Sequence, residues 1–141
     1  MKRLLLIVVI ISFSLACKKT KFEPEGPTDV RIRNLSDITL VEVIITSSEN
    51  AEDVDTLASI APGAVSEYMR FTKAYTEAII SAKVDVGGSM VTFSTLPLPF
   101  GFTSLTYVGQ VRETFEIYIS NMEKRELTIS NRILEEALVL E

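Results

Sequence analysis

From residue 29 onward, apolar and polar residues alternate over short stretches that turn residues interrupt. The clearest stretch is 112–120, where Phe115, Ile117 and Ile119 alternate with Glu116, Tyr118 and other polar positions. A period of two predicts a β-strand with one buried face. Further strands are expected at 30–33, 38–46, 64–71, 77–84, 90–95 and 126–130, and a short strand ends at Ile60.

Turn residues separate these stretches. Pro62 and Gly63 predict a turn, and Gly87-Gly88 between two apolar runs predicts a β-hairpin. Strict alternation fails within 38–46, where the apolar residues cannot all face one side, so we expect a β-bulge near Val41-Glu42 or a strand buried on both faces. The tail from residue 131 fits either a short amphipathic helix or an extension of a sheet edge.

This spacing of short strands predicts an all-β fold, because each strand has one apolar face to bury against another layer. We expect an antiparallel immunoglobulin-like β-sandwich of seven to eight strands over residues 29–141. Segment 96–104 is expected to be irregular, since Pro97 and Pro99 cannot donate to a sheet ladder.

The first residues have a different pattern. Lys2 and Arg3 precede an apolar run that reaches Ala16, and Cys17 follows as the sole cysteine of the 141-residue chain. The run is shorter than the roughly 20 apolar residues that a membrane-spanning helix needs. A positive segment, a short apolar segment and a small residue before the cut are typical of a secretory signal peptide. We expect a signal peptide at 1–16 and, at 17–28, the lipidated cysteine and a flexible tether that contains three Lys, two Pro and one Gly.

Leu15-Ala16-Cys17 resembles the lipobox of bacterial lipoproteins, although Ser14 occupies the place where that family usually has Leu. The resemblance implies that the Cys17 thiol receives a diacylglyceryl group and that the signal is cut before it. Segments 29–34, 36–40, 60–63 and 66–75 resemble small Bacteroidota lipoproteins with one β-sandwich domain. The resemblance covers most of residues 1–130, and it implies no activity and no binding residues.

The composition argues against several classes of functional site. The formal charge is −5, and loss of Lys2 and Arg3 with the signal makes the chain more acidic. Nucleic acid is therefore not an expected partner, because phosphate binding needs a basic surface. The chain has no histidine and one cysteine, so the usual zinc ligands and a Ser–His–Asp triad are missing, and we expect no cofactor and no metal.

Three groups of residues remain as candidate sites. The loop 47–55 holds several acidic side chains but lacks EF-hand spacing, so a solvated loop is the better interpretation. Glu113 with Glu116, and Glu135 with Glu136, are close in sequence, but acid–base catalysis needs carboxylates on different elements that face one cleft.

The third group lies in segment 96–107, which concentrates apolar and aromatic residues in an irregular stretch. Phe100, Phe102 and Tyr107 form a candidate partner surface. The alternative, which we prefer, is that this segment folds over the open end of the sandwich.

These observations favour a non-catalytic lipoprotein that acts as a binding or assembly module and is anchored to the cell-envelope membrane through Cys17. The expected partners are an envelope protein or a glycan. A carbohydrate- or surface-polymer-binding domain is the main alternative, although the chain has no tryptophan to form a sugar platform. A hydrolase is a third hypothesis. The resemblance to Bacteroidota lipoproteins implies the outer membrane. Surface-exported members often carry acidic residues just after the cysteine, and Lys18 and Lys19 are the opposite, so the resemblance implies the periplasmic side.

Overall fold

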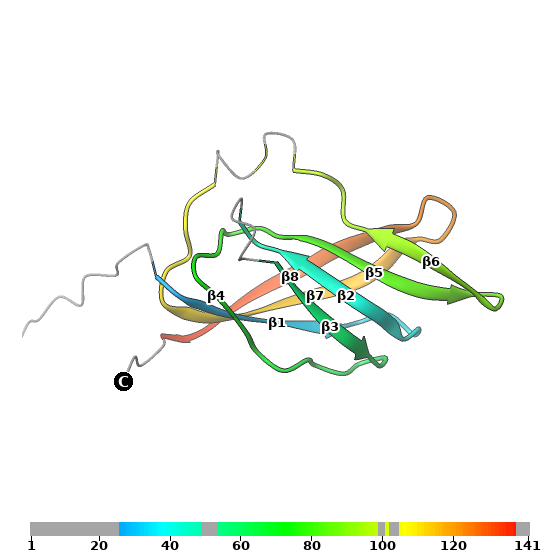
Figure 1. Ribbon diagram of the computed structural model, residues 1–141, viewed down its shortest axis with the longest axis horizontal. Coiled ribbons are helices and arrows are strands. Elements are labelled where there is room, and N and C mark those ends of the chain that lie inside the picture. Colours follow the sequence, from blue (N-terminus) through cyan, green and yellow to red (C-terminus); the bar gives the residue numbers. More distant parts are fainter. Residues whose placement is uncertain (1–25, 49–53, 99–100, 102–104, 138–141) are drawn as a thin grey trace, which may run out of the picture.

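The computed structural model describes residues 26–48, 54–98, 101 and 105–137, with the side chains of 136 and 137 left out. These residues form eight β-strands and no helix (Figure 1). The strands are β1 (Thr28–Asn34), β2 (Leu40–Thr46), β3 (Val54–Ile60), β4 (Met69–Phe71), β5 (Ile79–Val86), β6 (Ser89–Ser94), β7 (Val111–Asn121) and β8 (Glu126–Ala137). Within these ranges there is accordingly no helix long and apolar enough to cross a membrane.

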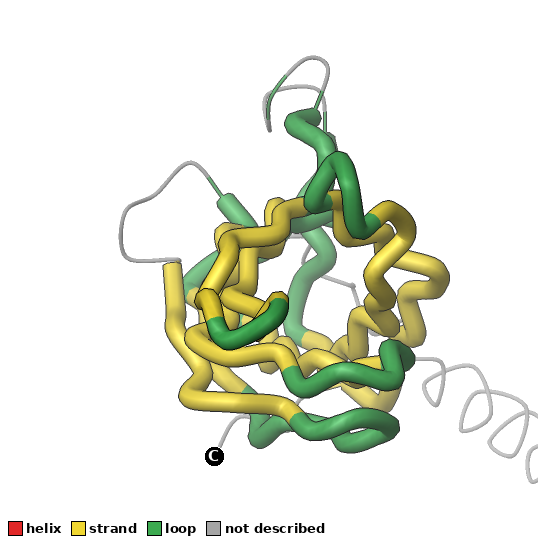
Figure 2. Tube along the Cα trace, turned by 90° about the vertical axis from the view of Figure 1, so that its right-hand side faces the viewer, coloured by secondary structure: helices red, strands yellow, loops and turns green. Residues whose placement is uncertain are grey.

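All eight strands belong to one sheet with the order β3-β2-β5-β6-β8-β7-β1-β4. The sheet curls into a nearly closed ring around a packed core (Figure 2). The all-β, sandwich-like fold with seven to eight strands is therefore confirmed. Pairing is not antiparallel throughout, because β1 lies parallel to β7 and β6 lies parallel to β8. Alternation along a strand reports its buried face but not the direction of its neighbour, so the sequence did not predict these two pairs.

The core follows the apolar period of the strands. Val30 and Ile32 on β1 are fully buried, and so is Ile117 on β7. Phe115 is 1% exposed, while Tyr118 on the opposite face is 37% exposed. The predicted inward face of the 112–120 stretch is thus confirmed, with Ile119 packed partly buried against the core.

The irregularity in β2 is a β-bulge. The register between β2 and β5 shifts between Val41 and Ile44, and Glu42 has a positive φ of 46°. The shift lets Leu40, Val43 and Ile45 all reach the core, where each is fully buried. The bulge predicted near Val41-Glu42 is therefore confirmed.

The predicted hairpin at Gly87-Gly88 joins β5 to β6. Val86 pairs with Ser89, and the two glycines between them have φ values of 63° and 88°. Both values lie in the left-handed region, which glycine enters without a Cβ penalty. A two-residue turn of this kind matches the twist of the flanking strands.

One strand boundary was predicted wrongly, and the two alternatives left open for the tail are now decided. The expected strand 64–71 is regular only at Met69–Phe71, although Val65 still bridges to Arg33 on β1. For the tail from residue 131, the structure supports the sheet extension rather than the helix, because β8 continues as strand to Ala137 and pairs with β7 along that length. Backbone pairing with β7 outweighs the helical spacing of the tail's apolar residues.

Candidate binding groove

β8 has one paired edge and one nearly free edge. Its pairing with β7 extends from Glu126 to Ala137, whereas the described part of β6 pairs with it only through Ser94 and Glu126. In a strand, backbone N–H and C=O groups of alternate residues point to opposite edges. The described structure therefore leaves the edge of β8 beyond Glu126 without a neighbouring strand.

The free edge exists because the chain leaves β6 at Thr95. The Thr95 backbone N–H donates to the Ile80 carbonyl at 2.8 Å, and its side-chain Oγ1 accepts from the Ile80 N–H at 3.0 Å. These two bonds tie Thr95 to β5 instead of β8. Pro97 follows and has no N–H to donate, so the chain does not return to a ladder there.

Two adjoining pockets follow this free edge, and together we call them the β8 groove. The larger pocket has a volume of about 440 Å³ and lies between Thr76-Glu77 and residues 129–132, with Phe115 beneath. The smaller pocket, about 200 Å³, lies between residues 95–98 and 127–129. Both are lined by Glu77 and Ile129, so they lie next to each other along β8.

The walls of the β8 groove carry both apolar and charged side chains. Leu96 is 67% exposed, an unusual state for a leucine beside a groove. Leu98, Leu127 and Ile129 complete an apolar patch in the smaller pocket. Glu77 is exposed and lines both pockets, and its carboxylate has no ion-pair partner among the described side chains.

A buried ion pair fixes one end of the groove. Arg132 lines the larger pocket, and its Nε donates to Glu113 Oε2 at 2.6 Å. Glu113 is fully buried, and its other oxygen, Oε1, has no hydrogen-bond partner in the described structure. Burial raises the pKa of Glu113, and the adjacent Arg132 guanidinium opposes that rise. The pair neutralises Arg132, so Glu77 dominates the charge of the groove.

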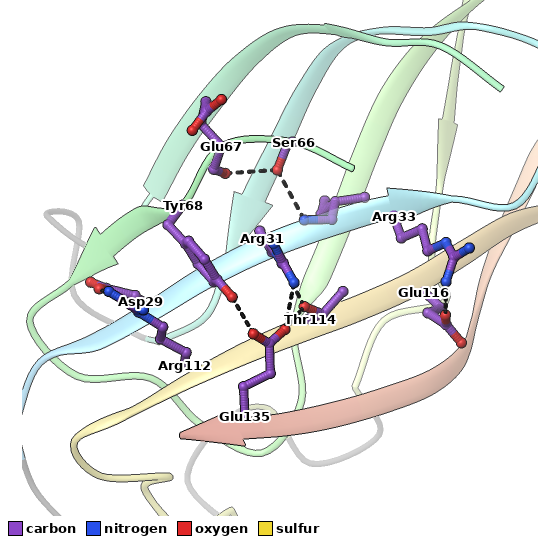
Figure 3. Close-up of polar contacts among 11 residues, drawn as sticks. Asp29, Arg31, Arg33, Ser66, Glu67, Tyr68, Arg112, Thr114, Glu116 and Glu135 are labelled. Carbon is purple, nitrogen blue, oxygen red and sulfur yellow. Dashed lines mark hydrogen bonds and ion pairs between the residues drawn. The ribbon is translucent and has the colours of Figure 1, made fainter. Parts of the chain in front are cut away.

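A second polar cluster covers the outer face of the sheet formed by β4, β1, β7 and β8 (Figure 3). Glu135 on β8 accepts hydrogen bonds from the Tyr68 hydroxyl, from Thr114 Oγ1 at 2.5 Å and from Arg31 Nη2 at 2.8 Å. The hydrogen bonds from Thr114 and Tyr68 are the main causes that lower the pKa of Glu135. The cluster joins β8 to β7, to β1 and to the segment before β4.

Arginines surround Tyr68 in this cluster. The guanidinium of Arg31 lies 4.5 Å from the centre of the ring, and that of Arg112 lies 5.2 Å from it. Arg70 forms a two-pronged pair with Asp29, with distances of 2.7 and 3.0 Å. Because each of the three arginines lies within ion-pair distance of Asp29 or Glu135, the cluster is best explained as a set of contacts that joins strands rather than as an open ligand site.

The structure describes one of the four predicted site residues. Cys17, Phe100 and Phe102 lie outside the described residues. The ring of Tyr107 stacks on that of Tyr75 with centroids 4.6 Å apart and an interplanar angle of 14°. Lys73 Nζ lies 4.9 Å from the centre of the Tyr107 ring. The half-buried Tyr107 is thus engaged in contacts within the chain.

The carboxylates that are neighbours in sequence do not share a cleft. Glu113 is buried beside Arg132, whereas Glu116 pairs with Arg33 at 3.2 Å. Glu135 belongs to the outer cluster, and the side chain of Glu136 lies outside the described set. In the described ranges, no three His, Cys, Asp or Glu side chains gather as a metal site would require, and most of the acidic loop 47–55 falls outside those ranges.

The β8 groove itself was not predicted. Pro97 and Pro99 marked where the chain leaves the sheet, but the free edge of β8 depends on which strands become neighbours in space. In the sequence, Glu77 is a polar residue at the start of an expected strand, and nothing marks it as part of a site. Only the fold brings it to the same pocket as Ile129.

Comparison with known proteins identifies no family for this chain. No protein-family model matches the chain, and no curated protein matches it significantly. A solved NMR structure of a protein from Eubacterium rectale is similar, with a TM-score of 0.44 and 11% identity. The match covers 77% of this chain and 92% of that one.

Proposed function

We propose that this protein is a non-catalytic binding module, held at the cell-envelope membrane by a lipid on Cys17, and that it engages its partner through the β8 groove. The single observation that carries the binding role is an open groove beside a strand edge that, among the residues the structure describes, lacks a neighbouring strand. Exposed strand edges and exposed apolar side chains are costly to leave uncovered, so they commonly mark interaction sites.

The charges near the groove support binding rather than acid–base chemistry. Glu113 is already neutralised by Arg132, which leaves Glu77 as the carboxylate that faces the groove without a partner in the described structure. Glycosidase-type chemistry uses two carboxyl groups on opposite sides of a substrate. The groove offers a surface with one negative charge, apolar side chains and backbone groups.

The proposed anchor rests on the sequence. A lipidated Cys17 with two or more acyl chains gives stable membrane attachment. Because β1 begins at Thr28, the tether between Cys17 and β1 is residues 18–27, which would hold the domain off the lipid by up to roughly 35 Å if fully extended. A partner in the envelope could reach the β8 groove without contact between the domain and the bilayer.

A carbohydrate-binding function has less support. Sugar sites favour an aromatic face that is open to the ligand. Tyr75 is only 8% exposed, and the Tyr107 ring is stacked on Tyr75 with Lys73 near its centre. A glycan array with the purified protein tests this alternative directly.

Site-specific photocrosslinking in native membranes tests the proposal. A photoreactive residue replaces Leu96 in the groove or, as a control, Met90, which is 50% exposed at the other end of β6. We expect a crosslinked envelope protein from position 96 and none from position 90. The absence of crosslinks at 96, or equal crosslinks at both positions, would contradict the role of the groove.

The same membranes test the anchor. Mass spectrometry of the mature N-terminus should show an acylated Cys17, and Cys17→Ala should abolish acylation. An unmodified thiol at Cys17, or cleavage elsewhere, would contradict the anchor while leaving the groove result unaffected.

A further inference from the structure

We infer that the β8 groove takes an extended peptide segment of a partner protein, which adds to the free edge of β8 as a new strand and places a basic side chain over Glu77. This inference rests on the proposed binding function and names the chemistry of the partner. Three features of the groove lead to it: the backbone edge, the apolar pocket and the unpaired charge.

The backbone edge provides the pairing groups. The parallel pairing of β6 with β8 stops at Ser94 and Glu126, and the groove begins at the next position of β8. A peptide in the groove would continue the pairing that β6 begins. The wall 127–132 suits an extended segment of about six residues at roughly 3.3 Å per residue. Strand addition of this kind obtains affinity from main-chain hydrogen bonds.

The apolar patch provides a place for side chains. Alternate side chains of an added strand point toward the same face. In the smaller pocket those side chains would meet Leu96, Leu98 and Ile129. Covering Leu96, which is 67% exposed, would remove apolar surface from water. We therefore expect apolar residues at alternate positions of the peptide.

Glu77 provides the charge selection. It lines both pockets, so a bound segment must pass beside its carboxylate. Arg132 at the end of the groove is already neutralised by Glu113. The groove is thus negative overall, and a Lys or Arg in the peptide would complement it.

A second copy of this chain is a poorer occupant. The chain has a net charge of −5, so two copies repel each other. Residues of segments 76–78 and 95–98 line the groove opposite β8, and its two pockets have volumes of about 440 and 200 Å³, which suit one extended segment. A flexible segment of a partner protein can carry a positive charge and can enter the groove as a single extended chain.

The test is selection of nonapeptides from a random displayed library against the full-length, detergent-solubilised protein. Selected peptides are then synthesised and their dissociation constants measured by calorimetry. We expect apolar residues at alternate positions and a Lys or Arg. Glu77→Gln should weaken binding about threefold, as for a partly exposed ion pair, and the loss should shrink at high salt. Glu67→Gln, at an exposed carboxylate outside the groove, should change nothing.

Two further measurements separate strand addition from other modes of binding. Leu96→Asp should weaken binding about tenfold, as for loss of a buried apolar contact, while Met90→Asp should have no effect. Peptides N-methylated at one set of alternate amides should lose binding, and those methylated at the other set should retain it, since only one set faces β8. Amide hydrogen exchange within 127–132 should slow when the peptide binds.

Several outcomes would overturn the inference. The first is failure to select any peptide, and the second is an equal effect of the two methylation patterns on binding. The third is slower amide hydrogen exchange in a strand other than β8 when the peptide binds. The fourth is a dimer that forms without peptide and that Leu96→Asp dissociates. A protein crosslinked at Leu96 in membranes, combined with any of these outcomes, would preserve the proposed function and reject the peptide mode. Absence of the membrane crosslink together with specific peptide binding would reject the proposed cellular role alone.

Discussion

Glu113 and Arg132 form a buried ion pair in which Nε of the arginine lies 2.6 Å from a carboxylate that is 0% exposed. They lie on the paired strands β7 and β8, near a shift in register. Removing a charge from water costs several kcal/mol unless a partner compensates it. Arg132 therefore has two roles, because it neutralises Glu113 and forms part of the groove wall.

Arg132→Met should destabilise the fold by about 3–5 kcal/mol, the usual result when a buried charge loses its partner. The double variant Glu113→Leu with Arg132→Met should lose clearly less than Arg132→Met alone, because no isolated charge remains. Urea unfolding of the wild type, Glu113→Leu, Arg132→Met and the double variant measures this. Additive losses would show that the two side chains do not act as a pair.

The same pair predicts a dependence on pH. Burial raises the pKa of Glu113 above its value in the unfolded chain, so the folded state holds its proton to higher pH. The contribution of this group to stability therefore falls as pH rises from the unfolded pKa through the folded pKa. Loss of Arg132 removes the opposing charge and raises the pKa further. The penalty of Arg132→Met should consequently be smaller at pH 4.5 than at pH 7, and an equal penalty at both values would contradict this reasoning.

The contribution of Glu135 to stability should depend on pH in the opposite direction to that of Glu113. Hydrogen bonds from Thr114 and Tyr68 lower its pKa, so its contribution is present above the unfolded pKa and is lost as pH falls through the folded pKa. Tyr68→Phe removes one of these donors and should cost about 1–2 kcal/mol at pH 7. The difference between Tyr68→Phe and the wild type should shrink in acid, as thermal unfolding at several pH values can show.

Tyr118→Phe is the matched control for Tyr68→Phe. Tyr118 is 37% exposed on β7, so removal of its hydroxyl should leave stability within about 0.5 kcal/mol of wild type at every pH. A similar acid-dependent loss at Tyr118 would mean that the effect does not arise from the hydrogen bond to Glu135.

The sequence predicted the strands better than their neighbours. Phe115, Ile117 and the β2 bulge follow from side-chain period alone, because each strand must place its apolar residues inward. The parallel pairing of β1 with β7 joins residues such as Ile32 and Phe115, which are far apart in the chain. Local pattern contains no information on such pairings, and for that reason the mixed sheet was missed.

The groove and the outer cluster were missed for the same reason. The period of two already places Glu113 on the inward face with Phe115 and Glu116 on the outward face, but it does not show that Glu113 pairs with Arg132 or that Glu116 pairs with Arg33. The register shift between β7 and β8 decides which side chains oppose each other. Residues 1–25, which contain Cys17, lie outside the described structure, so the anchor remains a prediction from sequence.

The core of β7 can be tested by a pair of adjacent substitutions. Ile117 is fully buried, so Ile117→Ala should cost about 2–5 kcal/mol through the cavity it creates. Glu116→Ala should cost about 1 kcal/mol or less. The Glu116 side chain is 14% exposed and accepts hydrogen bonds from Arg33 and Asn131, but Arg33 is 47% exposed, and ion pairs that face the solvent contribute little. Chemical denaturation gives both values. Equal costs at the two positions would contradict the assigned inward face.

The β2 bulge predicts a stabilising substitution. Glu42 has a φ of 46°, a left-handed conformation that a residue with a Cβ adopts at a cost of about 1 kcal/mol or more. Glu42 also pairs with Lys83 at 2.5 Å, but both side chains are substantially exposed, so that ion pair contributes little. Glu42→Gly removes the strain and the pair, whereas Glu42→Ala removes the pair and keeps the strain. We therefore expect Glu42→Gly to unfold at higher urea concentration than Glu42→Ala, by about 1 kcal/mol in stability. If the alanine variant were the more stable of the two, the positive φ at the bulge would not be a source of strain.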